Sequence, residues 1–400
     1  MNKARLILED GTVFQGKSFG SRKPSAGEVV FATGMVGYEQ SLTDPSYCGQ
    51  ILIFTYPLIG NWGVPPKKYW ESEKIQISGL VISDLTTNPH HHLMEQTLDQ
   101  WLKAENVAGI WDIDTRKLTQ KLRERGVMLG KIVTGNQDID FVNPNAENLV
   151  EKVSPKKLAI YQPNPKSEIR FSTENLLKAS NPKQYQNSND KNSKRFEHSN
   201  LENSNLFRVS KFDIRNSPKI GLLNCGAKRN ILRNLLARRA TVYELPWNYD
   251  PFANNLPIDG LVISNGPGDP KQPRGSIEII KKALQKKIPT FGICLGNQLL
   301  ALAAGGDTFK LKFGHRAQNQ PTIDIFTKHC YITTQNHGFA VSEKKLPDGF
   351  KRWFYNANDN TNEGIIHEKL PFWGVQFHPE AAPGPTDTEF LFDFFMEKFK

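Results

Sequence analysis

The sequence predicts an α/β protein in two folded parts: a strand-rich, mixed amino-terminal domain and a doubly wound, mainly parallel α/β domain. Two observations carry this prediction. Short runs with strand character are frequent up to about residue 154, whereas strands and amphipathic helices alternate from residue 218 onward. A polar stretch rich in Asn, Ser and Lys lies between them. We therefore predict domains at 1–158 and 218–400, joined by a mostly disordered linker at 159–217.

The composition bounds the class of protein. Of 400 residues, 38% are hydrophobic and 10% aromatic, which is enough apolar material for two ordinary cores. Apolar runs stay well short of the roughly 20 residues that span a bilayer, and Glu9 and Asp10 interrupt the apolar start of the chain. The four cysteines lie far apart without C-x-x-C spacing. We expect a reducing compartment, and no membrane segment, signal peptide, disulfide framework or zinc-binding cysteines.

Charge and histidine content raise two further possibilities. The net charge of +10 would suit a nucleic-acid partner, but no nucleic-acid-binding motif is recognisable and the basic residues are scattered. His90-His91-His92 could bind a metal, but three adjacent side chains in a polar stretch cannot all converge from one regular element. We therefore expect no nucleic-acid partner and no metal in this chain.

In the first domain, apolar flanks surround Asp10-Gly11, which is the strongest short-range signal for a β-hairpin. Residues 5–14 should therefore form two antiparallel strands. Further strands and two helices follow from apolar runs and from 3.6-residue periodicity. The strands are expected at 28–33, 50–55 and 74–82, and the helices at 93–105 and 115–125. This domain shows no catalytic constellation of its own.

From Pro218 onward, strands and helices alternate. Such alternation is typical of a doubly wound, flavodoxin-like sheet with helices on both faces, in which ligands bind at the carboxyl ends of the strands. The expected strands are 219–224, 241–245, 260–264 and 290–293, and the expected helices are 228–239, 276–287, 297–304 and 389–400.

The most informative stretch of this domain is 290–304, where an apolar strand meets a cysteine between two glycines and continues as an alanine-rich helix. Gly-x-Cys-x-Gly has the form of a nucleophile elbow, in which glycines permit a sharp turn that lifts the side chain above the sheet. Cys294 is therefore the candidate nucleophile. Taken alone, it could equally be a buried cysteine that packs as a small hydrophobe.

Two other stretches favour the catalytic interpretation. An apolar run ends in His378 and Glu380, so the carboxylate can orient the imidazole while the other ring nitrogen faces a thiol. Another apolar strand leads into a Gly- and Pro-rich loop at 265–270, where backbone can approach a ligand closely. Cys294, His378 and Glu380 together form a candidate Cys-His-Glu triad.

Four motifs of the second domain occur in a fixed order, at Ser264–Pro270, Gly292–Gln298, Gln335–Ala340 and Phe377–Glu380. They resemble the class I (triad) glutamine amidotransferases, which hydrolyse the side-chain amide of glutamine through a cysteinyl acyl-enzyme. In the first domain, the similarity narrows to the carbamoyl-phosphate synthetase small subunit. It is carried by Leu8–Thr12, Gly27–Tyr38, Leu42–Tyr47 and Asp112–Thr119. The resemblance covers nearly the whole chain apart from the linker.

The resemblance implies a set of site residues. Cys294 would attack the glutamine amide, with His378 as base and then acid and Glu380 as its orienting carboxylate. Backbone N–H groups of Leu295 and Gly266 would receive the oxyanion. L-Glutamine would be held by residues of both domains: Ser46, Gly266, Gly268, Leu295, Gln298, Asn336, Gly338 and Phe339.

The resemblance also implies a partner, because the chain holds no nucleotide-binding motif that could use ammonia. Ammonia would pass through a channel to a large subunit, which makes carbamoyl phosphate from bicarbonate and two ATP for arginine and pyrimidine biosynthesis. ATP, Mg²⁺ and K⁺ would bind to the large subunit, and this chain would need no cofactor.

Some points stay open. Asn297 stands where many relatives have histidine, and His337 is a possible rival base, although we favour a structural role because its sequence offers no adjacent carboxylate. The chain could also be an amidotransferase of another synthase, or a catalytically silent scaffold. The compartment is expected to be either the plastid stroma or the bacterial cytoplasm. The plastid is favoured by the Lys- and Asn-rich composition, which is typical of AT-rich coding DNA, and by the cyanobacteria-like sequence of Thr43–Ile51.

Overall fold

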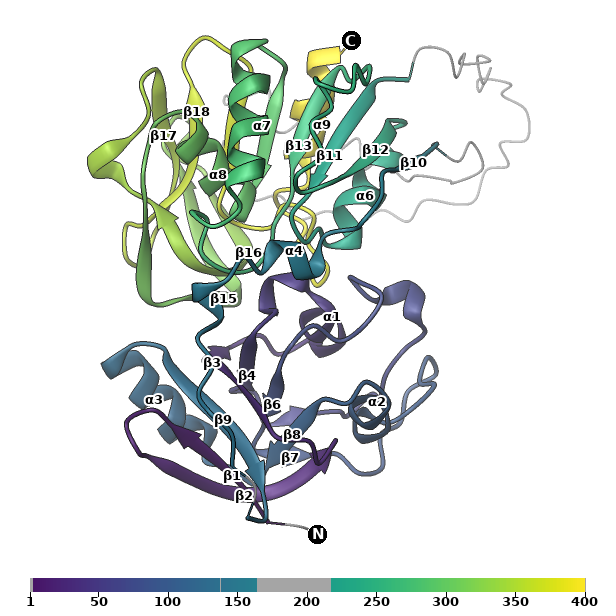
Figure 1. Cartoon of the computed structure of the whole chain (residues 1–400), viewed down its shortest axis with the longest axis vertical. Coiled ribbons are helices and arrows are strands. Elements are labelled where there is room, and N and C mark those ends of the chain that lie inside the picture. The colour runs from purple at the N-terminus through teal and green to yellow at the C-terminus, as the bar shows by residue number, and fades with distance from the viewer. Residues whose placement is uncertain (1–2, 137, 164–216, 400) are drawn as a thin grey trace, which may run out of the picture. The chain divides into compact units, whose positions relative to one another are not determined.

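The computed structural model describes residues 3–136, 138–163 and 217–399 (Figure 1). These residues form one sheet closed into a barrel, one large open sheet and a small two-stranded sheet, so the predicted fold class is confirmed. Residues 1–163 and 218–400 belong to one compact unit. The predicted linker lies, from residue 164 to 216, outside the described residues. No helix of the described part is long and apolar enough to cross a bilayer.

Seven strands near the amino terminus close into the barrel, in the order β1-β2-β8-β6-β4-β3-β9. They are β1 (Lys3–Leu8), β2 (Val13–Gly20), β3 (Ser25–Ala32), β4 (Gln50–Phe54), β6 (Gly79–Val81), β8 (Ala108–Trp111) and β9 (Met128–Thr134). The helices of this part are α1 (Tyr38–Thr43), α2 (Leu98–Ala104), α3 (Thr115–Arg125) and the short α4 (Val150–Val153), and β5 (Leu58–Ile59) pairs with β7 (Asp84–Leu85). Successive barrel residues alternate between two cores: Val29 packs with α3, and Val30 with α1 and α2.

Two predicted elements of the barrel region are wrong in extent. The strand predicted at 74–82 is reduced to β6, because the preceding backbone bonds elsewhere: the N–H of Gln76 donates to the carbonyl of Leu42 at 2.8 Å. The helix predicted at 93–105 begins only after Thr97, whose hydroxyl caps it in a capping box. The predicted hairpin and the second predicted helix are confirmed.

The open sheet has ten strands, in the order β10-β12-β11-β13-β14-β19-β18-β17-β15-β16. Its central five, from β12 to β19, run parallel, and the other neighbours pair antiparallel. The parallel strands are β11 (Lys219–Asn224), β12 (Thr241–Pro246), β13 (Gly260–Ile263), β14 (Thr290–Ile293) and β19 (Phe372–Val375). The others are β10 (Ala159–Tyr161), β15 (Thr308–Asp324), β16 (Cys330–Val341), β17 (Phe350–Asn356) and β18 (Asn362–His367).

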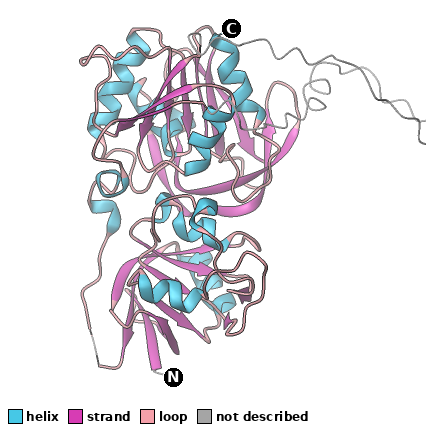
Figure 2. Cartoon of the chain, turned by 90° about the vertical axis from the view of Figure 1, so that its right-hand side faces the viewer, coloured by secondary structure: helices cyan, strands magenta, loops and turns pink. Residues whose placement is uncertain are grey.

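Helices cover both faces of the parallel strands, as Figure 2 shows. They are α6 (Arg229–Ala237), α7 (Arg274–Gln285), α8 (Leu295–Ala303) and α9 (Phe390–Met396). Successive side chains of β11 point to opposite faces of the sheet and so contact different helix layers. Leu222 packs with α6 and α9, whereas Leu223 packs with α7 and α8. The helix predicted at 389–400 is shorter than expected, because α9 passes into a 3₁₀ turn after Met396.

Two parts of this sheet were not predicted. Residues 159–161, which we assigned to the linker, form β10 and pair with β12 at the edge of the sheet. The antiparallel strands β15 to β18 were also not predicted from the sequence. Register shifts after Lys310 and Ala317 interrupt the pairing of β15 with β16, so no clean period of two marks these strands.

The packing of Phe291 tests the core under α9. This side chain is fully buried, and its ring centroid lies 5.9 Å from those of Phe392 and Phe395. Phe291→Ala should lower the free energy of unfolding by about 3–5 kcal/mol in urea denaturation, because it leaves a cavity in a packed core. Phe326→Ala, at a residue that is 58% exposed, is the control and should cost less than about 0.5 kcal/mol. Equal losses would contradict this core.

Candidate active site

Three adjacent parallel strands bring the predicted site residues to one edge of the sheet. These strands lie in the order β13-β14-β19, and Ile293 at the end of β14 pairs with Val375 at the end of β19. The 265–270 loop, Cys294 and the segment with His378 follow the carboxyl ends of these strands. The N–H of Cys294 donates to the carbonyl of Val375 at 2.8 Å, which fixes the cysteine beside the segment that carries the histidine.

The backbone at Cys294 forms the predicted elbow between β14 and α8. Its φ is 54°, a conformation that residues with a side chain rarely adopt. The flanking residues must be glycines, because other backbone segments approach them too closely for a side chain. A Cβ on Gly296 would lie 2.2 Å from the carbonyl oxygen of Ile263, and a Cβ on Gly292 would lie 2.5 Å from Gly296. The strand can therefore turn sharply into the helix and present the thiol at the sheet edge.

The structure brings Cys294, His378 and Glu380 together in a buried site. Nδ1 of His378 lies 2.6 Å from Oε1 of Glu380, so Nε2 is the ring nitrogen left for the thiol. Burial lowers the pKa of His378, but the Glu380 carboxylate and the nearby Cys294 sulfur outweigh burial and raise it from 6.5 to about 10. The site thus favours the imidazolium that forms when the thiol gives up its proton.

A buried lysine extends this arrangement. Nζ of Lys228 lies 3.2 Å from Oε1 of Glu380 and donates to the carbonyl of Ala381. Burial raises the pKa of Glu380, but the Lys228 ammonium and the His378 imidazole outweigh burial and lower it from 4.5 to about 2. Glu380 is therefore ionised and can hold its histidine. Lys228 was not among the predicted site residues, because nothing in the local sequence distinguishes it from a surface lysine.

A cavity beside Cys294 is lined by all eight residues predicted to bind glutamine. The amide nitrogen of Gln298 donates to the carbonyl of Phe339 at 2.7 Å and to the amide oxygen of Gln376 at 3.1 Å, so the orientation of this amide is fixed. Gln376 also donates to the Cys294 sulfur at 3.7 Å and is a further contact that the sequence analysis missed. The eight residues are Ser46, Gly266, Gly268, Leu295, Gln298, Asn336, Gly338 and Phe339.

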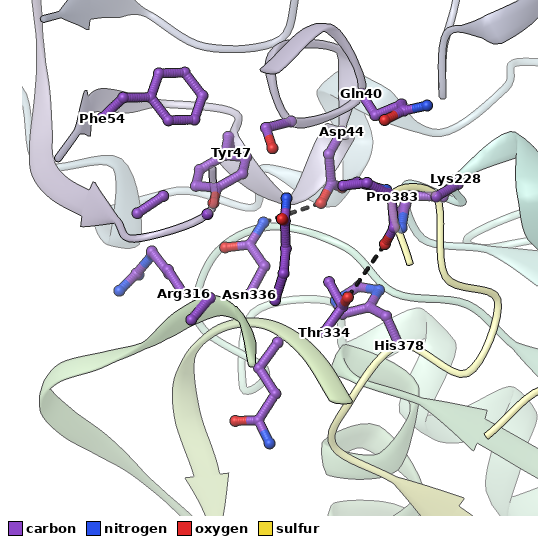
Figure 3. A pocket seen from close by; sticks show the side chains of 17 residues that line it. Gln40, Asp44, Tyr47, Phe54, Lys228, Arg316, Thr334, Asn336, His378 and Pro383 are labelled. Carbon is purple, nitrogen blue, oxygen red and sulfur yellow. Dashed lines mark hydrogen bonds between the residues drawn. The ribbon is translucent and has the colours of Figure 1, made fainter. Parts of the chain in front are cut away.

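Ser46 comes to this cavity from the barrel part, on the turn η1 (Pro45–Tyr47), as expected. The amide nitrogen of Asn265 donates to its hydroxyl at 2.8 Å. Asp44 accepts from the N–H of Ser46 at 2.9 Å and from the amide nitrogen of Asn336 at 3.0 Å; Figure 3 shows this last bond. Asp44 stands in a motif that we recognised, but the sequence assigned it no role. It connects the turn that carries Ser46 to the strand that carries Asn336.

The two open positions lie outside the triad. Asn297 is fully buried and does not line the cavity beside Cys294. His337 lines it, but Nδ1 of His337 is 2.9 Å from the carbonyl oxygen of Phe339, and Nε2 is 3.9 Å from a carboxylate oxygen of Glu363. The sequence could not reveal this carboxylate, because Glu363 arrives from β18. Burial and a neighbouring imidazole hold the pKa of His337 well below 6.5, which favours a structural role.

Two family descriptions match the chain. "Carbamoyl-phosphate synthase small chain, CPSase domain" matches residues 6–132, and "Glutamine amidotransferase class-I" matches residues 221–398. The chain therefore contains one domain of each of these two families. The two matched ranges fall inside the two domains that the sequence predicted, and the second range contains the whole triad.

Curated relatives are similar over nearly the whole chain. "Multifunctional protein pyr1-3" of Dictyostelium discoideum is 42% identical over 99% of this chain and 17% of its own length. "Multifunctional protein URA2" of Saccharomyces cerevisiae is 42% identical over 99% of this chain and 17% of its own length. "Carbamoyl-phosphate synthase (ammonia), mitochondrial" of Mus musculus is 40% identical over 99% of this chain and 24% of its own length. The chain thus spans a quarter or less of the length of these relatives.

The low pKa of Glu380 predicts a pH-dependent contribution to stability. A carboxylate whose pKa falls from 4.5 to about 2 on folding stabilises the fold fully above about pH 5 and loses that contribution as the pH falls toward 2. Between pH 5 and pH 3, the free energy of unfolding should therefore fall by about 2 kcal/mol more in the wild type than in Glu380→Gln. Urea denaturation at both pH values measures this, and parallel pH profiles would refute it.

Proposed function

We propose that this chain is the glutaminase part of a carbamoyl-phosphate synthase and hydrolyses L-glutamine to glutamate and ammonia. One observation carries the proposal: Cys294 stands at a strand-to-helix elbow beside His378, which Glu380 orients, in a cavity with the predicted glutamine-binding residues. Family membership alone does not separate glutamine from ammonia as the nitrogen source, since one relative is named for ammonia. The assembled triad favours glutamine.

The chemistry follows from the protonation states of the triad. His378 takes the thiol proton of Cys294, and the thiolate attacks the amide carbon of glutamine. The C–N bond breaks as the imidazolium returns a proton to the leaving nitrogen, which leaves a γ-glutamyl thioester. Water, activated by His378, then hydrolyses the thioester to glutamate and the free thiol. The backbone N–H groups of Leu295 and Gly266 would stabilise the oxyanion of both steps, and both residues line the cavity.

A second cavity suggests how ammonia leaves. It shares Arg316 and Asn336 with the glutamine cavity, and His378 forms part of its wall (Figure 3). Because His378 protonates the leaving nitrogen, ammonia would be released toward this second cavity while the glutamate moiety still occupies the first. Side chains of the barrel part, among them Tyr47 and Phe54, form the opposite wall. This arrangement supports a route for ammonia that does not pass the substrate.

The acceptor of that ammonia would be a partner of the large-subunit type. It would combine ammonia with bicarbonate and two ATP to give carbamoyl phosphate for arginine and pyrimidine biosynthesis, and ATP, Mg²⁺ and K⁺ would bind there. All four cysteines of this chain are free thiols, in keeping with a reducing compartment such as the plastid stroma or the bacterial cytoplasm.

Covalent labelling tests the glutaminase proposal. A glutamine-mimicking diazoketone should modify Cys294 alone, glutamine should protect it, and Cys294→Ala should take up no label when measured by mass spectrometry. The same substitution should lower glutamine hydrolysis roughly a thousandfold or more. Cys330, which is exposed, serves as the internal control for non-specific alkylation. A chain that takes no label even with its partner present would be a scaffold and not an enzyme.

Co-purification tests the identity of the synthase. The partner should be a large ATP-using protein that makes carbamoyl phosphate when glutamine is supplied. Another ammonia-consuming synthase in its place would leave the glutaminase intact but overturn the assignment to carbamoyl phosphate.

A further inference from the structure

Beside the glutamine cavity, three strands of the open sheet bring polar side chains to one buried point. His315 of β15, His337 of β16 and Glu363 of β18 each offer an atom, and these three atoms lie within 4.8 Å of one another. Nδ1 of His315 is 3.3 Å from Nε2 of His337 and 3.3 Å from Oε1 of Glu363, and the last two atoms are 3.9 Å apart. The three side chains are only 10%, 1% and 0% exposed.

The outer atoms of both imidazoles fix which ring nitrogens face this point. Nδ1 of His337 lies 2.9 Å from the carbonyl oxygen of Phe339. A carbonyl oxygen only accepts hydrogen bonds, so Nδ1 carries the proton and Nε2 presents a lone pair. Nε2 of His315 lies 2.8 Å from Oδ2 of Asp359, which directs Nδ1 of that ring inward. A carboxylate or a carbonyl on the far nitrogen is the usual support of a metal-bound histidine.

A fourth acceptor completes the group. The amide oxygen of Gln335 lies 3.3 Å from Nε2 of His337. Its orientation is set, because the amide nitrogen of Gln335 donates to the hydroxyls of Thr333 at 3.1 Å and Thr322 at 3.3 Å. In addition, Oε2 of Glu363 is buried without a hydrogen-bond partner among the described residues. Several acceptors thus meet in a buried place, where the amide nitrogen of Asn356 donates to Oε1 of Glu363 at 3.4 Å and a bound cation would satisfy the remaining lone pairs.

We propose that His315, His337 and Glu363 bind a divalent transition-metal ion, with Zn²⁺ as the best match and the amide oxygen of Gln335 as a fourth ligand. Zn²⁺ bound at about 2.0–2.2 Å in a tetrahedron would space its ligand atoms about 3.3–3.6 Å apart. The observed spacings of 3.3, 3.3 and 3.9 Å need only small adjustments. Two imidazoles and a carboxylate suit zinc better than magnesium or calcium, which prefer oxygen ligands.

The ion would have a structural role next to the glutamine cavity. It would join β15, β16 and β18, and so hold the strand on which Asn336, Gly338 and Phe339 line that cavity. The inference does not rest on the glutaminase activity. It revises our expectation of a metal-free chain, which considered only the adjacent histidines at 90–92 and the cysteines. The alternative occupant of the point is a proton on Nδ1 of His315.

Zinc binding by the purified chain separates these two occupants. The metal-free chain, titrated with Zn²⁺ against a chromophoric chelator, should bind one equivalent, and zinc should raise its melting temperature. His315→Asn and Glu363→Gln should each weaken binding at least tenfold. Asp359→Asn, which keeps all ligands but removes the support of His315, should weaken it about 10- to 100-fold. Because Asp359 is 44% exposed, this variant should fold normally, as circular dichroism can verify.

The matched control replaces His90, His91 and His92 by asparagine, which removes the exposed histidine tract and should leave zinc binding unchanged. Loss of zinc in this control would place the ion at the tract and overturn the proposal. A wild-type chain that binds no stoichiometric zinc, with a melting temperature indifferent to the metal, would also overturn it and assign the buried point to the proton.

Discussion

The parallel pairing of β14 with β19 is the constraint on which the candidate site depends. Gly292 pairs with Gly374, and neither has room for a Cβ: the first would meet Gly296, and the second would meet Asn297. The first turn of α8 can therefore lie directly on the two strands. This contact makes the elbow at Cys294 possible, and a shift of the register by one residue would replace a glycine by a side chain beneath the helix.

In the buried site, the charged groups of Lys228, Glu380 and His378 stabilise one another. Burial alone would favour a neutral Glu380 and a neutral His378. Each charged group has a neighbour of opposite charge, however, because the Glu380 carboxylate interacts with both the Lys228 ammonium and the His378 imidazolium. The carboxylates of Glu71 and Asp44, which belong to the barrel part, also raise the pKa of Lys228. Residues of the barrel part thus act on the lysine that in turn stabilises the Glu380 carboxylate beside His378.

The predicted elements differ in how local their causes are. The hairpin at Asp10-Gly11 and the parallel strands were predictable, because turn residues and buried apolar runs act over a few neighbours. The helix predicted from residue 93 starts late, since the backbone at Gln96 pairs instead with Val64, which is distant in sequence. The antiparallel strands β15 to β18 carry bulges that break the period of two. Their sheet position was decided by pairing partners that no local pattern reveals.

The sequence by itself indicated the candidate nucleophile, its histidine and its carboxylate, because an elbow between two glycines and a His-x-Glu pair are short-range patterns with a defined chemistry. Through resemblance it also predicted a set of substrate-binding residues, all of which line the cavity beside Cys294. Only the tertiary structure decided the roles of Lys228 and Asp44, and the meeting of His315, His337 and Glu363. These side chains come from elements far apart in the chain. Their charges and lone pairs acquire meaning only at distances of a few ångströms inside a medium of low dielectric constant, and folding alone creates those distances.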